Sequence, residues 1–101
     1  KKQWFDMISK GVKKEEYREI KDYWIKRLKD MSLKEPFHAF IPYDKIVFKN
    51  GYAKNAPIMV VEFDGIRIGK GNTDWGADDE VCFCIKLGNI LYDSTKLKPC
   101  A

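Results

Sequence analysis

The sequence predicts an α+β fold, either a small β-barrel or a strongly curved mixed sheet, flanked by two or more helices. Two amphipathic helical patterns lie in the first 30 residues, and at least four short strand patterns follow residue 44. Short strands joined by tight turns are typical of curved sheets and small barrels. Helix and strand patterns do not alternate along the chain, which argues against the parallel sheet of an α/β protein.

The first helix is predicted over residues 2–10, because apolar side chains recur there at helical spacing and Gly11 follows as a C-terminal cap. The next stretch, residues 12–18, is polar. A second helix is predicted to begin near Asp22, a suitable N-cap, with an apolar stripe that ends at Leu28. The helices therefore come before the sheet in the chain.

Short runs of β-branched and aromatic residues predict the strands, and glycine-containing dipeptides predict the turns between them. Asp64-Gly65 is predicted as a hairpin turn, and Gly88-Asn89 as another. The glycine-rich stretch from Gly69 opens a polar loop that runs to Asp79. The predicted strands cover residues 45–49, 58–63, 66–68, 81–87 and 90–92.

The length of 101 residues suits one domain, so residues 1–101 are predicted as a single unit with a tail over 93–101. The composition, 45% hydrophobic and 34% charged, is typical of a folded chain. No apolar run approaches the roughly 20 residues that cross a bilayer, and the first residues contain no signal-peptide core. These observations predict a cytoplasmic protein with no membrane partner.

The three cysteines match no zinc pattern, and Cys82 and Cys84 are too close in sequence for an unstrained disulfide. Reduced, partly buried thiols are expected, with no metal and no cofactor. His38, the single histidine, has no Ser or Cys partner suggested by the sequence, so we do not expect it to be catalytic.

Positive charge is concentrated in the first half of the chain. Residues 1–50 carry 13 Lys or Arg and 8 Asp or Glu, a net charge of +5, whereas residues 51–101 carry 6 and 7, a net charge of −1. A basic half attracts polyanions such as RNA. Solvated faces of lysine-rich helices are the plainer explanation of the same charge.

The segment Gly11-Val12-Lys13-Lys14-Glu15-Glu16-Tyr17-Arg18 has the form G-x-K-x-x-E-x-R. Glu16 and Arg18 share a face on an extended strand, and Lys13 reaches the same site only if the backbone is still turning after Gly11. Together they provide a phosphate clamp and an acid/base group, and burial would lower the pKa of Lys13 toward that of a general base. A surface series of ion pairs is the alternative.

Other polar and aromatic residues near loops are candidate ligand contacts. Tyr17 lies beside basic residues and could stack on a base, and the loop after residue 49 is polar. The glycine-rich loop could close over a cleft with Trp75 as its anchor, or simply connect two strands. The predicted catalytic residues are Lys13 and Glu16, and the predicted ligand contacts are Gly11, Tyr17, Arg18, Asn50, Tyr52, Lys54, Lys70 and Trp75.

These motifs resemble the ASCH (activating-signal-cointegrator homology) domain family, in particular its small bacterial and phage members, over most of residues 3–92. Besides residues 11–18, the similar segments are Trp4-Phe5-Asp6-Met7-Ile8, Tyr23-Trp24, Phe48-Lys49-Asn50-Gly51-Tyr52, Gly69-Lys70-Gly71-Asn72 and Trp75-Gly76. The resemblance implies a PUA-like β-barrel with flanking helices and a cleft lined by the motif. It also implies a first strand before the first helix, which this sequence does not contain.

The resemblance implies binding of RNA or of a modified nucleoside. A small hydrolase is the alternative, because some relatives resemble amidohydrolases that remove an acyl group from a modified cytidine, and others resemble ribonucleases. In the amidohydrolase branch a threonine follows the motif lysine by three residues, and Glu16 stands at that position here. A protein-interaction module is the second alternative.

Overall fold

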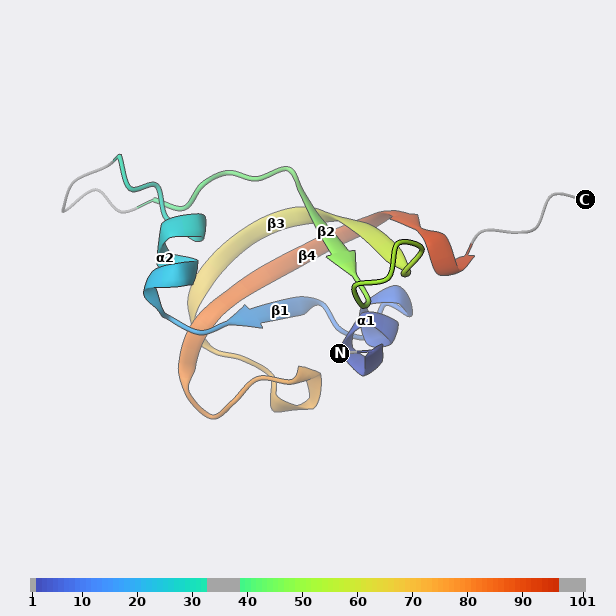
Figure 1. Ribbon diagram of the computed structural model, residues 1–101. Coiled ribbons are helices and arrows are strands. Elements are labelled where there is room, and N and C mark those ends of the chain that lie inside the picture. The colour runs from blue at the N-terminus through green and yellow to red at the C-terminus, as the bar shows by residue number, and fades with distance from the viewer. Residues whose placement is uncertain (1, 33–38, 97–101) are drawn as a thin grey trace, which may run out of the picture.

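The computed structural model describes residues 2–32 and 39–96, and this part of the chain forms two α-helices packed against a four-stranded sheet (Figure 1). The predicted α+β class with a curved sheet and flanking helices is confirmed. The elements are α1 (Lys2–Ser9), β1 (Glu15–Arg18), α2 (Asp22–Leu28), β2 (Lys45–Lys49), β3 (Ile58–Lys70), the 3-10 helix η1 (Thr73–Trp75), β4 (Val81–Asp93) and the 3-10 helix η2 (Ser94–Lys96).

The sheet has the order β1-β4-β3-β2, and each neighbouring pair is antiparallel. The two long central strands, β3 and β4, curl the sheet into a half-barrel, while the short strands β1 and β2 form its two edges (Figure 1). Figure 1 also shows α1 and α2 at opposite ends of β1. The two edges and the two helices therefore surround the concave side of the sheet.

The two predicted hairpin turns are wrong, because β3 continues across Asp64-Gly65 and β4 continues across Gly88-Asn89. The pairing of β3 with β4 instead shifts register between Phe63 and Ile66, which marks a β-bulge or a similar irregularity. Gly65 takes a φ of 112° there, a conformation open mainly to glycine. The turn-like residues thus bend two long strands and do not reverse them.

The second helix begins at Asp22 itself, so its N-cap lies one residue before the predicted one. Lys21 is the N-cap, with extended backbone and no side-chain cap hydrogen bond, and Asp22 is the first helical residue. A carboxylate in the first turn still interacts favourably with the helix dipole. The error therefore concerns the boundary and leaves the helix itself as predicted.

The core lies between the concave face of the sheet and the two helices. Phe83, near the start of β4, is completely buried, and its ring meets Phe40 edge to face at 5.9 Å between centroids. Apolar residues of both helices pack on the same cluster. The buried apolar residues of this core are Phe5, Ile8, Leu28, Met59, Val61, Phe83, Ile85 and Leu87.

The end of β4 is tied to α1 through a buried carboxylate. Asp93 accepts a 2.5 Å hydrogen bond from the Ser9 hydroxyl and two more from Thr95, and Lys96 donates to the Ser9 carbonyl. Burial alone would raise the pKa of Asp93, but these hydrogen bonds hold it below its usual value. Described structure therefore continues past the start of the predicted tail to Lys96, and residues 97–101 lie outside the described part.

Cys82 and Cys84 are buried thiols with their sulfurs 3.8 Å apart, as expected from their spacing on one strand. Burial and the neighbouring thiol raise the pKa of Cys84 to about 11. Cys84 is therefore a thiol at neutral pH. No helix in residues 2–32 or 39–96 has the length and apolarity needed to cross a membrane.

Candidate functional site

The motif begins at the C-terminus of α1, where Gly11 takes a φ of 75°. Its N–H donates to the Ile8 carbonyl at 2.9 Å, and the Val12 N–H donates to the Met7 carbonyl at 2.9 Å. This pair of bonds is the Schellman arrangement, which ends a helix and turns the chain sharply. The predicted cap at Gly11 is confirmed, and the turn carries Lys13 toward the same site as the strand that follows.

Lys13 is only 2% exposed, and its ammonium group is held by several partners. It donates a hydrogen bond to the Trp75 carbonyl and lies 3.4 Å from the Glu16 carboxylate. It also lies 5.3 Å from the ring centroid of Trp4 and 4.8 Å from that of Tyr17. These contacts satisfy a buried cation through a carboxylate, a carbonyl and two aromatic faces.

Glu16 and Arg18 continue the site along β1, and they share a face as the strand geometry predicts. Their carboxylate and guanidinium groups are 3.4 Å apart, and Arg18 lies 4.9 Å from the ring centroid of Trp24. Arg18 donates to the Tyr17 carbonyl at 2.7 Å, while the Tyr17 N–H donates to Glu16 at 2.9 Å. Lys13, Glu16 and Arg18 thus form one connected group, called here the motif cluster.

The pKa of Lys13 is lowered because the side chain is buried, and the nearby Glu16 carboxylate offsets part of this shift. Burial also raises the pKa of Tyr17, to about 12. The Tyr17 hydroxyl donates to Glu15 at 3.0 Å and accepts from the Asn72 N–H at 3.0 Å. Tyr17 is therefore an uncharged phenol whose hydrogen bonds connect β1 to the loop that begins at residue 71.

A cleft lies between the two edge strands and contains two adjoining cavities. The cavity beside α1, of about 550 Å³, is lined by Trp4, Phe48 and Tyr52 among others, and we call it the α1 cavity. The cavity beside α2, of about 340 Å³, is called the α2 cavity. Glu16, Arg18 and Phe48 line both. Glu16 and Arg18 of the motif cluster therefore lie at the junction of the two cavities, whereas the buried Lys13 lines neither.

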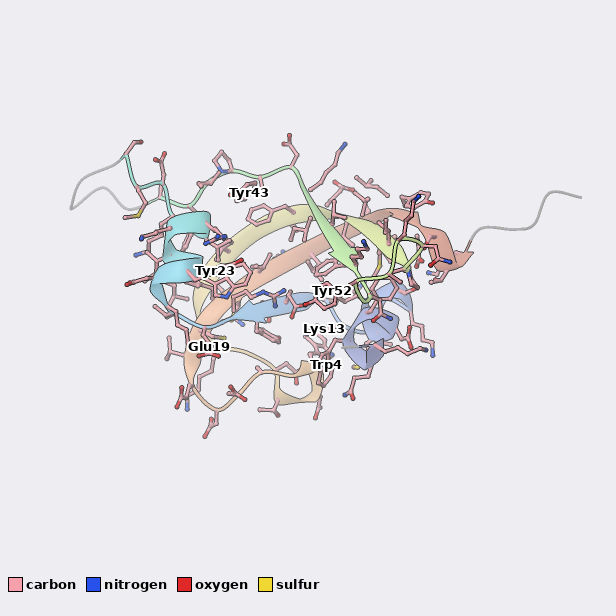
Figure 2. The ribbon with its side chains drawn as sticks, viewed as in Figure 1. Trp4, Lys13, Glu19, Tyr23, Tyr43 and Tyr52 are labelled. Atoms are coloured by element: carbon pink, nitrogen blue, oxygen red, sulfur yellow. The ribbon has the colours of Figure 1, made fainter. Side chains whose placement is uncertain are left out.

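Not all of the predicted contacts lie at this cleft. Asn50 and Tyr52 line the α1 cavity, although the Tyr52 side chain is fully exposed, at 103%. Lys54 is exposed and lines neither cavity, and Lys70 pairs at 3.2 Å with Asp79 on an exposed surface. Figure 2 shows Trp4, Lys13 and Tyr52 gathered near α1, and Tyr23 near α2.

The glycine-rich loop packs against β1 and α1, and it lines neither cavity. A Cβ on Gly71 would lie 2.4 Å from the Tyr17 ring, and a Cβ on Gly76 would lie 2.8 Å from the Trp4 ring. Gly76 also has a φ of 97°. The loop therefore needs glycine for close contact with two aromatic rings, and Trp75 contributes its carbonyl to Lys13.

Trp4, Trp24 and Phe48 were not predicted as site residues. Trp24 packs against the core, and it also lines the α2 cavity and lies against the guanidinium group of Arg18. Helical spacing gives the same pattern for a core aromatic and for one at the wall of a cleft. The sequence therefore held no signal that separates these two roles.

Among the residues that the structure describes, no three His, Cys, Asp or Glu side chains converge as metal ligands would, and His38 lies outside that part. In comparisons with known proteins, no protein-family model matches the chain, and no curated protein or solved structure matches it either. The resemblance to the ASCH family therefore stays a prediction from the motifs.

Proposed function

We propose that the α1 cavity binds one nucleoside unit, either within RNA or as a free modified nucleoside. The observation that carries this proposal is the pair of Glu16 and Arg18 at the edge of a cavity with aromatic walls. A carboxylate accepts hydrogen bonds and a guanidinium donates them, as the edges of an unpaired base require. Trp4 and Phe48 offer faces on which a base can stack.

The size and charge of the site support the same ligand. A cavity of about 550 Å³ falls in the range of small-molecule sites. Lys49 lines it beside Arg18, so two cations face one carboxylate there. The ASCH resemblance adds weight, because two residues of its motif, Glu16 and Arg18, line the cleft. Buried thiols at Cys82 and Cys84 favour a reducing compartment, and we propose the cytoplasm.

Replacing Arg18 by alanine is expected to weaken binding by roughly 10- to 100-fold, because a hydrogen bond to a charged group contributes about 1.5–3 kcal/mol. The measurement is a titration of the wild type and Arg18→Ala with cytidine, an acylated cytidine and short single-stranded RNA. RNA should bind more weakly at about 200 mM than at about 50 mM salt.

Lys70→Ala is the matched control, because Lys70 is also basic but lies outside both cavities. It should bind all three ligands as the wild type does. The proposal is overturned if no nucleoside or RNA binds, or if Arg18→Ala binds as tightly as Lys70→Ala while both variants remain folded.

A hydrolase is the second candidate, and the observation that favours it is the Glu16 carboxylate at the cavity edge, 3.4 Å from the buried ammonium group of Lys13. Lys13 is buried, so the more accessible Glu16 would take the proton from an attacking water and pass it to the leaving group. The water oxygen would form the new bond to the acyl carbon or phosphorus, and the amine or ribose oxygen would leave protonated. Lys13 would hold the Glu16 carboxylate in place through their ion pair.

Incubation with an acylated cytidine and with single-stranded RNA tests this second candidate. If the protein is a hydrolase, the wild type should hydrolyse the acylated cytidine or the RNA. The rate of hydrolysis should fall at least 100-fold in Glu16→Gln, since acid/base catalysis contributes roughly 10²- to 10⁴-fold to the rate. Glu62→Gln, a change at a carboxylate that lines neither cavity, should retain activity. Absence of turnover, or full turnover by Glu16→Gln, would exclude this mechanism.

A further inference from the structure

The α2 cavity is lined by more basic residues than its neighbour, and it is also lined by aromatic rings. Arg18, Arg27 and Lys45 line it, against the single carboxylate of Glu16. Its walls include the rings of Trp24 and Tyr43. Nucleotide-binding sites usually combine cations, which bind the phosphate, with aromatic rings, which stack on the base. A free nucleoside in the α1 cavity would not contact these basic and aromatic side chains of the α2 cavity.

A row of stacked side chains connects the motif cluster to the surface of α2. Arg18 lies over Trp24 at 4.9 Å, and Tyr23 meets the Trp24 ring edge to face at 4.9 Å. Arg27 lies 3.4 Å from the centroid of the Tyr23 ring. The row therefore has a cation at each end and two aromatic rings between them.

The outer part of this row is held in place although it is exposed. Arg27 donates to the Tyr23 carbonyl at 2.8 Å, and the Tyr43 hydroxyl donates to the Arg27 carbonyl at 2.6 Å. Tyr23 nevertheless remains 56% exposed. In Figure 2, Tyr23 and Tyr43 lie on the side of the molecule that carries α2. An exposed ring with a fixed guanidinium can stack on a base with little loss of side-chain entropy.

We propose that the α2 cavity and the Tyr23–Arg27 pair bind the nucleotide next to the one in the α1 cavity. The ligand is then a single-stranded oligonucleotide of two or more nucleotides. Its linking phosphate is held at the junction by Arg18 together with Arg27 and Lys45, which line the same cavity. The second base stacks on Tyr23. This inference rests on the proposed function of the α1 cavity and extends it to a longer ligand.

The test compares ligands of increasing length: cytidine, cytidine monophosphate, the dinucleotide CpC and a five-nucleotide oligocytidine, each as RNA and as DNA. CpC should bind the wild type about 5- to 100-fold more tightly than cytidine, in line with the stacking of one further base. Tyr23→Ala and Arg27→Gln should lose most of this gain and bind cytidine as the wild type does. Both residues are exposed, so both variants should unfold at the wild-type urea concentration.

Lys26→Ala is the matched control, because Lys26 is an exposed cation of α2 that lines neither cavity. Lys26→Ala should show the same increase in affinity from cytidine to CpC as the wild type. If cytidine binds but CpC gains nothing, or if the gain survives both Tyr23→Ala and Arg27→Gln, the inference is overturned and the proposed function stands. If the monophosphate shows the whole gain, the α2 cavity is only a phosphate site and the inference also fails.

Absence of binding by every ligand would remove the proposed function together with the inference. A gain with RNA alone would support a site that also reads the 2′-hydroxyl. An equal gain with RNA and DNA would support a site for single-stranded nucleic acid in general.

Discussion

Replacing Lys13 by methionine is expected to lower the free energy of unfolding by about 1–3 kcal/mol, since a buried acceptor loses its donor. Methionine has a similar length but no charge, so the Trp75 carbonyl and Glu16 lose their shared partner. Glu16 keeps Arg18 at 3.4 Å and is partly exposed, which keeps the loss below the 3–5 kcal/mol typical of a broken buried ion pair. Urea unfolding followed by tryptophan fluorescence measures this difference.

Lys14→Met is the matched control, because Lys14 is the neighbouring lysine and is exposed. Its effect should stay within about 0.5 kcal/mol, as for most surface substitutions. Lys13→Ala should cost roughly 2 kcal/mol more than Lys13→Met, since it removes further buried methylene groups. Equal unfolding midpoints for Lys13→Met and Lys14→Met would show that the Lys13 contacts contribute nothing to stability.

The difference in free energy of unfolding between the wild type and Lys13→Met should increase with pH. Burial lowers the pKa of Lys13 in the folded protein, so the unfolded chain binds this proton more tightly. Between the lowered pKa and the ordinary value of 10.5, the stability of the wild type rises with pH through this group. Lys13→Met has no such proton. The stability lost in this variant should therefore grow as the pH is raised toward about 9.5, below the ordinary pKa of tyrosine.

The local patterns predicted the elements well, because each is set by nearby residues. Gly11 after an amphipathic helix predicted a cap, and the structure shows the expected positive φ and the two capping hydrogen bonds. The spacing of Glu16 and Arg18 predicted a shared face, which the strand provides. Lys13 was expected to join them only if the chain turned after Gly11, and the cap supplies that turn.

Features that depend on distant parts of the chain were not predictable in the same way. Asp64-Gly65 has the sequence of a hairpin turn, but continuous pairing of β3 with β4 makes an irregular bend there. The partner of Lys13 is a carbonyl 62 positions away, at Trp75. Lys70 was expected at the cleft, yet its strand carries it to Asp79 on another surface. Packing of the half-barrel decided each of these outcomes.

Phe83 links the core to the candidate site through the sheet. It lies on β4 opposite Arg18 of β1 and opposite Ile68 of β3. Its side chain is fully buried and contacts Phe40, which precedes β2 in the chain. The position of Arg18 at the cleft therefore depends on a strand whose inner face is anchored by this ring.

Phe83→Ala is expected to lower the free energy of unfolding by about 3–5 kcal/mol, the usual cost of emptying a buried aromatic site. A domain of this size has only about 5–15 kcal/mol to lose, so the variant should be partly unfolded at 37 °C. Phe83→Leu should cost less and keep cytidine binding, because it refills most of the volume and leaves β4 paired with β1. Val81→Ala, on the same strand but half exposed, should cost under about 1 kcal/mol. Thermal and urea unfolding measure all three. Equal stability of Phe83→Ala and Val81→Ala would mean that this core does not hold the half-barrel together.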